Sequence, residues 1–115
     1  MTEPTLDIRA EHLAIVHAIL QKCVPGCEVW AFGSRAQGRA KTYSDLDLAI
    51  ITDEPLPLQV LAMLEEEFAE SNLPWKVDVV DWATTSSSFR AIIERAKVVQ
   101  LGVRTQSAVS ETPND

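Results

Sequence analysis

The pattern of hydrophobic and polar positions along the chain predicts helices and strands in alternation. Apolar residues recur at helical spacing in three segments, predicted as amphipathic helices over residues 6–22, 58–68 and 89–96. Shorter runs rich in β-branched and aromatic residues predict strands at 28–32, 46–51, 75–82 and 98–101. The resulting order, α-β-β-α-β-α-β, predicts an α/β fold (α+β mixed sheet) in which helices pack on a mixed sheet.

The length of the chain predicts one domain. With 115 residues and 12.7 kDa, the chain is long enough for a single core and too short for a catalytic domain plus a substrate domain. We predict that residues 1–103 form this domain and that 104–115, which lack an apolar period, are a disordered tail. A large substrate must then be held by a second protein or a second copy.

The charge of the chain bears on its partners. A formal net charge of −7 provides no general field to attract phosphate backbones, so long nucleic acid is not expected as a partner. Arg35, Arg39 and Lys41 nevertheless form a local basic spot, which suits a small anion such as a nucleoside triphosphate; solvated loop cations are an equally open interpretation. No signal peptide and no apolar run near 18 residues is visible, so we expect a cytoplasmic protein without a membrane segment.

Two aspartates interrupt the second predicted strand. Residues i and i+2 of a strand point to the same face, so Asp45 and Asp47 are expected to project side by side. Carboxylates at that spacing repel each other unless a cation lies between them, and Mg²⁺ accepts a few carboxylates together with substrate phosphates. For an isolated pair, a strand end at which both acids meet water is the more common explanation.

A Gly-Ser pair stands ten residues before these aspartates. Gly33 and Ser34 follow the first predicted strand, where backbone N–H groups and the serine hydroxyl would cradle a terminal phosphate. Glycine suits such a turn because its missing Cβ lets the backbone approach an anion closely. Taken alone, the pair is also consistent with an ordinary turn.

The third predicted strand offers a third carboxylate, which two-metal nucleotidyl transfer needs. Asp78 and Asp81 differ by three residues, so they point to opposite faces and only one of them can join the pair. Asp78 lies inside an apolar run, where an unpaired carboxylate would be costly to bury. We therefore assign Asp78 to the metal site and interpret Asp81 as a helix-approach or surface residue.

The combined motif resembles the nucleotidyltransferase superfamily typified by DNA polymerase beta. In its size, and in the strings VWAFGSR, YSDLDLAII and LPWKVDVVDWATTS, the chain resembles the minimal nucleotidyltransferase family, in particular the subgroup paired with HEPN-domain proteins. The resemblance covers roughly residues 13–99 and implies a nucleotidyltransferase core. It also implies that the best-understood members are antitoxins, which transfer AMP from ATP to a tyrosine of a HEPN RNase toxin and so silence it.

The resemblance further implies which residues act. Asp45, Asp47 and Asp78 match the catalytic metal carboxylates, expected to hold two Mg²⁺ ions when ATP is bound. Gly33 and Ser34 match the phosphate-binding turn, and Arg35 and Arg39 are the expected nucleotide contacts.

One position departs from the family pattern. Residue 37 is Gln, where many relatives carry Arg, so the choice of triphosphate cation among Arg35, Arg39 and Lys41 stays open.

Two other functions are compatible with the same residues. The alternative is a non-catalytic binding module that neutralises the HEPN partner by direct occlusion, since an acidic surface suits a basic RNA-binding partner. An antibiotic or RNA nucleotidyltransferase is disfavoured because the chain has no room for a substrate domain and is acidic.

Overall fold

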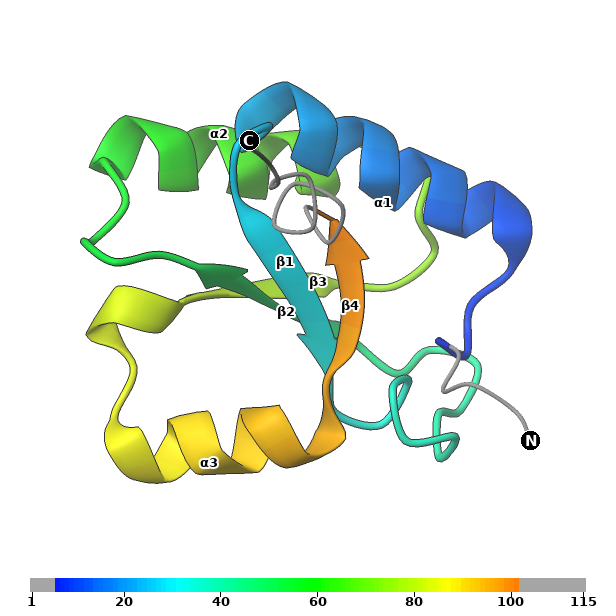
Figure 1. Ribbon diagram of the computed structural model, residues 1–115. Helices are drawn as coiled ribbons and strands as arrows, with labels where there is room; N and C mark the ends of the chain where they lie inside the picture. Colours follow the sequence, from blue (N-terminus) through cyan, green and yellow to red (C-terminus); the bar gives the residue numbers. More distant parts are fainter. Residues whose placement is uncertain (1–5, 102–115) are drawn as a thin grey trace, which may run out of the picture.

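The computed structural model describes residues 6–101, and its elements follow the predicted order (Figure 1). The elements are α1 (Ala10–Cys23), β1 (Glu28–Phe32), β2 (Leu46–Ile51), α2 (Leu58–Ala69), β3 (Val77–Asp81), a short 3₁₀ helix η1 (Trp82–Thr84), α3 (Ser87–Ala96) and β4 (Val98–Leu101). The predicted tail at 104–115 lies outside the described residues. None of the helices within 6–101 is long and apolar enough to cross a membrane.

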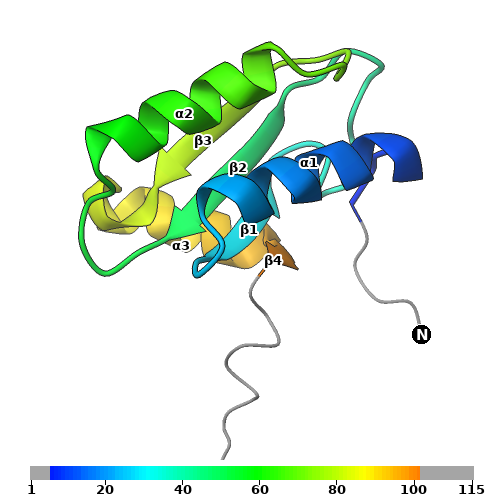
Figure 2. The same cartoon turned by 90° about the horizontal axis from the view of Figure 1, so that it is seen from above.

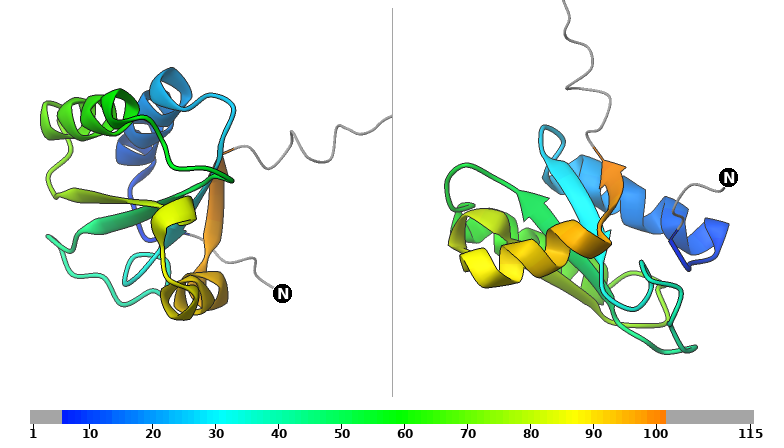
Figure 3. Two further views of the ribbon diagram at one scale, coloured as in Figure 1. Left: turned by 90° about the vertical axis from the view of Figure 1, so that its left-hand side faces the viewer. Right: turned by 60° about the horizontal axis from the view of Figure 1, so that its bottom comes forward.

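The strands form one mixed sheet, as predicted. Its order is β3-β2-β1-β4, with β2 and β3 parallel and β1 antiparallel to both of its neighbours. Helices α1 and α2 lie side by side on one face of the sheet, and α3 lies on the other (Figures 2 and 3). Each face of the central strands therefore meets a helical layer.

The alternation along β2 decides which side chains enter the main core. Leu46, Leu48 and Ile50 are fully buried in the cluster beneath α1 and α2. Ala49 belongs to the smaller cluster on the α3 side, together with Ile93. Because Asp47 shares the parity of Ala49, its carboxylate is kept out of the main core and directed to the α3 side of the sheet.

The third strand is shorter than the sequence pattern indicates, because Asp81 turns the backbone. Its side chain accepts hydrogen bonds from the N–H of Ala83 at 3.2 Å and of Leu56 at 2.7 Å, and from Thr52 Oγ1 at 2.6 Å. The strand therefore ends at Asp81, and Trp82 begins η1. The helix-approach part of the prediction for Asp81 is confirmed, and the surface part is wrong, since only 7% of this residue is exposed.

We predict that Asp81→Ala lowers the free energy of unfolding by about 3 kcal/mol, because it removes the acceptor of the part-buried Leu56 N–H and of the Thr52 hydroxyl, and one of the two acceptors of the Ala83 N–H. Urea unfolding followed by circular dichroism measures the change. Asp53→Ala is the matched control, since Asp53 is an exposed acid of the neighbouring turn, and it should stay within about 0.5 kcal/mol of the unaltered chain. Equal losses in the two variants would contradict the role given to Asp81.

Candidate active site

Two aspartates from neighbouring strands meet on the α3 side of the sheet. Asp47 of β2 and Asp78 of β3 are register partners in the parallel pair. Adjacent strands lie about 4.8 Å apart, and paired residues project to the same face, so the two carboxylates stand side by side. Both side chains are half-buried. The structure thus brings Asp78, and not Asp81, to Asp47.

Asp45 stands apart from this pair. Asp45 and Asp47 are predicted to project side by side, as residues i and i+2 of one strand do, but β2 begins at Leu46, whose N–H donates to the carbonyl of Lys76 at 2.9 Å. Asp45 is exposed on the segment that leads into β2. Among residues 6–101, no three His, Cys, Asp or Glu side chains lie close enough together to hold a metal ion. Asp45 therefore needs a small movement, or a ligand, to join the pair.

The electrostatics of the pair favour a bound cation. Burial raises the pKa of Asp47 above its ordinary value, and the nearby carboxylates of Asp78 and Asp45 raise it further. Lys76 Nζ lies 3.7 Å from Asp78 Oδ1, but this pair is largely exposed and compensates little of the repulsion. Two adjacent carboxylates with open coordination positions fit Mg²⁺, which binds a few carboxylates and completes its shell with phosphates and water.

Gly33 joins the turn after β1 to this aspartate pair. Its φ is +80°, and a Cβ at this position would overlap Oδ2 of Asp47. The turn is closed by hydrogen bonds from Ala36 and Gln37 N–H to the carbonyl of Gly33, both at 3.1 Å. Glycine meets both requirements best, because a side chain at this φ is strained and its Cβ would displace the carboxylate of Asp47. A phosphate held on this turn would lie next to the carboxylates.

Arg35 does not face the cleft, contrary to the prediction that it contacts nucleotide. Only 5% of it is exposed, and its guanidinium lies 4.5 Å from the ring centroid of Trp75. It donates hydrogen bonds at 2.9–3.3 Å to four backbone carbonyls, those of Asp7, Lys41, Thr42 and Ser44. These bonds occupy most of its donors, so Arg35 fixes the segment that leads to Asp45 instead of binding an anion.

Arg39, unlike Arg35, lines the cleft that contains the two aspartates. It is exposed, and its guanidinium donates to the side-chain oxygen of Gln37. Both residues line a cleft of about 580 Å³ together with Gly33, Asp47 and Asp78. Gln37 is the position that departs from the family pattern, and its side chain thus orients Arg39. Sequence reasoning did not foresee this contact, although the two-residue spacing is compatible with it.

The opposite wall of the cleft is apolar. It consists of five side chains from β1, β3 and α3, namely Phe32, Val80, Phe89, Ile92 and Ala96. Phe89 and Ile92 are 37% and 54% exposed despite their apolar character, whereas neighbouring Ile93 is fully buried. No site role was predicted for the helix at 89–96. The available signal is that Ile92 and Ile93, being adjacent, point in different directions around the helix and cannot both face the sheet. The cleft has the volume of a small-molecule site with both polar and apolar walls.

Comparisons with known proteins agree with this geometry. The family model described as "Polymerase beta, Nucleotidyltransferase" matches residues 16–100. A Haemophilus influenzae protein named probable protein adenylyltransferase MntA is 61% identical over 94 residues, which are 82% of each chain.

Two solved structures are also similar to this chain. A toxin–antitoxin complex with AMP-PNP is similar over 83% of this chain and 75% of that one, at 25% identity and a TM-score of 0.68. A complex of tri-AMPylated Shewanella oneidensis HEPN toxin with MNT antitoxin shares the fold, at 20% identity and a TM-score of 0.64 over 87% of this chain and 77% of that one.

We predict that Gly33→Ala destabilises the protein by about 1–3 kcal/mol more than Gly38→Ala. Gly38 also has a positive φ, +72°, but no atom lies within 4 Å of its added Cβ, so it isolates the backbone strain. The excess at Gly33 should shrink in an Asp47→Ala background, where the clash is removed. Thermal and urea unfolding of the four variants measure this, and an unchanged excess would contradict the contact.

We predict that Asp47→Asn stabilises the metal-free protein at neutral pH. The pKa of Asp47 is raised in the folded state, so the ionised carboxylate opposes folding above that pKa. As the pH falls through the raised pKa of Asp47 in the folded protein, the carboxylate becomes protonated. The difference in stability between the unaltered protein and the variant should then disappear. Melting temperatures in EDTA, compared between the two proteins from neutral to acid pH, measure this, with Asp53→Asn as control. A variant that melts lower at neutral pH would contradict it.

Proposed function

Because the chain belongs to the nucleotidyltransferase family typified by polymerase beta, we propose that it is a Mg²⁺-dependent protein adenylyltransferase, the antitoxin of a toxin–antitoxin pair. Its substrate is ATP, and its acceptor is a tyrosine of a HEPN-domain partner. The observation that carries this proposal is the pairing of Asp47 and Asp78 beside the Gly33 turn in one cleft. The similarity to MntA and to toxin–antitoxin complexes supports the choice of acceptor.

The aspartates hold the metal in this proposal. Asp47 and Asp78 lie in register, and Asp45, whose charge already acts on Asp47, completes the set on nucleotide binding. When bound, Mg²⁺ neutralises charge on the phosphates and lowers the barrier to attack on phosphorus. Relief of the repulsion that raises the pKa of Asp47 contributes to cation binding.

The phosphates lie against the turn and Arg39. Gly33 brings the backbone close to Asp47, so a triphosphate on the turn would lie beside the carboxylates that would hold Mg²⁺. Ser34 is the next residue of this turn and is partly exposed, as a hydroxyl donor to phosphate requires. Arg39, oriented by Gln37, meets the developing charge of the leaving group.

The transfer then needs little chemistry from the protein. The acceptor hydroxyl oxygen attacks the α-phosphorus of ATP, the bond to the β-phosphate oxygen breaks, and pyrophosphate leaves. The phenolic proton passes to Asp78, whose side chain is 45% exposed at the open edge of the sheet, and from there to water. Positioning and electrostatic stabilisation supply most of the rate, as in phosphoryl transfer generally.

We predict label transfer when the protein is incubated with Mg²⁺, ATP labelled in its α-phosphate and its HEPN-domain partner. Asp47→Asn should lower the rate at least about 100-fold, a loss typical for removal of an electrostatic contact to the reacting group. Asp53→Asn, an exposed acid outside the cleft, should leave the rate unchanged.

The same variants separate catalysis from occlusion. Cells that express the HEPN protein should survive with the unaltered chain and fail with the Asp45→Asn, Asp47→Asn double variant. No label on the HEPN protein, together with full protection by the double variant, would overturn the enzymatic proposal in favour of occlusion.

A further inference from the structure

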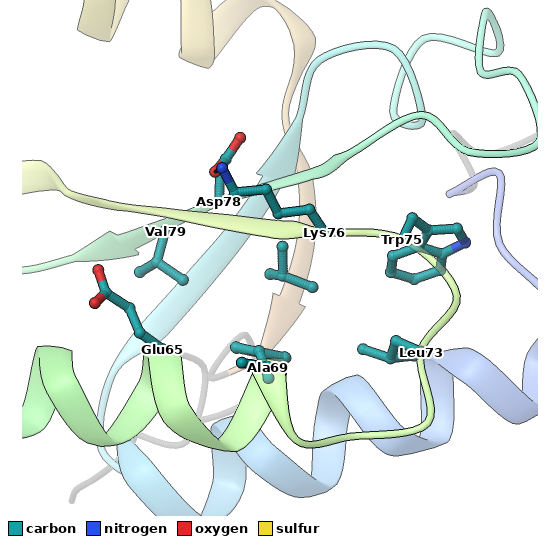
Figure 4. A pocket seen from close by; sticks show the side chains of 9 residues that line it. Glu65, Ala69, Leu73, Trp75, Lys76, Asp78 and Val79 are labelled. Atoms are coloured by element: carbon teal, nitrogen blue, oxygen red, sulfur yellow. Dashed lines mark ion pairs between the residues drawn. The ribbon is translucent and has the colours of Figure 1, made fainter.

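A second cavity, of about 500 Å³, runs along the outer edge of β3 beneath α2 (Figure 4). Its apolar lining comes from α2, β3 and the segment between them, and consists of Phe68, Leu73, Trp75, Val77 and Val79. Glu65 of α2 and Lys76 lie at its rim. We call this cavity the edge groove. The function proposed above makes no use of it.

The edge groove is continuous with the active-site cleft through Asp78, which lines both. In Figure 4 the side chain of Asp78 projects away from α2, whereas Val79 points toward it. Val77 and Val79 pack against the core beneath α1 and α2, while Val80 packs against the cluster on the α3 side. Successive residues of β3 thus alternate between the groove and the cleft.

The backbone of β3 is open on the groove side. β3 ends the strand order, and no other strand within residues 6–101 pairs with its outer edge. The carbonyl of Lys76 accepts the N–H of Leu46, so the backbone groups of Lys76 and Asp78 face β2. In a parallel ladder the intervening residues face the other way, so the N–H and C=O of Val77 and Val79 point outward.

We propose that the outer edge of β3 receives an extended segment of the protein that accepts the nucleotide. This inference rests on the proposed function. A strand added to this edge would pair with the outward groups of Val77 and Val79. Its residue beside Asp78 would project to the cleft and carry the acceptor hydroxyl, while its two flanking residues, preferably apolar, would enter the edge groove.

Charge and position favour this occupant over a second copy of the chain. Two copies paired edge to edge would unite two molecules of net charge −7, and an antiparallel register centred on Asp78 would also bring two carboxylates together. A segment of another protein can instead place a basic side chain against exposed Glu65. It also delivers its hydroxyl to the one aspartate of the pair that lies on an edge strand, Asp78, since β2 is enclosed by β1 and β3.

Amide hydrogen exchange of the unaltered chain tests strand addition. With the HEPN protein and a non-hydrolysable ATP analogue bound, the Val77 and Val79 amides should exchange at least tenfold more slowly than in the free chain. Amides of Asp78 and Val80, already paired with β2, should change little. Unchanged exchange at Val77 and Val79 in the complex would overturn the proposal. Protection of these amides in the free chain that increases with protein concentration would also overturn it, because it would show that a second copy binds the edge.

Ala69→Trp tests the groove directly. Ala69 is exposed and lines the groove from α2, so an indole there fills the space for a flanking residue. The KM for the HEPN protein should rise at least tenfold, while affinity for the ATP analogue stays unchanged. Ala62→Trp, two turns earlier on the exposed side of the same helix and outside the groove, should alter neither. Equal KM values in the three proteins would show that the edge groove does not bind the acceptor segment. Absence of transfer by the unaltered chain would instead overturn the proposed function.

Discussion

The close approach of Gly33 to the carboxylate of Asp47 is the constraint on which the site depends. It joins the turn after β1 to the middle of the sheet, with no room for a side chain between them. Asp47 is in turn the register partner of Asp78, so one carboxylate contacts the turn on one side and the second aspartate on the other. The fold therefore brings the turn at Gly33 together with the carboxylates of Asp47 and Asp78 before any ligand is present.

Both ends of β2 are held by buried polar groups. Arg35 fixes the segment that enters β2 through its bonds to the carbonyls of Lys41, Thr42 and Ser44. Asp81 fixes the segment that leaves it, through Thr52 and Leu56. Such anchoring compensates for a strand that carries an unfavourable charge, because burial and neighbouring acids raise the pKa of Asp47. The site is thus built at a cost in stability that the surrounding hydrogen bonds offset.

The sequence predicted the parts of this arrangement that depend on local pattern. Helices and strands follow from periodicity. The alternation of a strand shows that only one of Asp78 and Asp81 can join Asp47, and the apolar run around Asp78 favours that residue. The register that places Asp47 beside Asp78 does not, because it depends on pairing between segments about 30 residues apart. The error at Arg35 has the same origin: the carbonyl of Asp7 and the ring of Trp75 are distant in sequence, and an arginine beside a phosphate turn suggests an anion until they are known. Gln37 differs from Arg35 in this respect: it departs from the family pattern, yet it lies in the cleft and accepts a hydrogen bond from Arg39.

The position of Asp78 at the sheet edge explains how so small a domain can act on a protein. A carboxylate in a central strand is reached only from above or below the sheet, where helices cover both faces here. Asp78 is reachable also from the side, where the backbone of β3 is unpaired within the described chain and the edge groove begins. Nucleotide and acceptor can then approach from different directions, the triphosphate along the turn at Gly33 and the acceptor along β3.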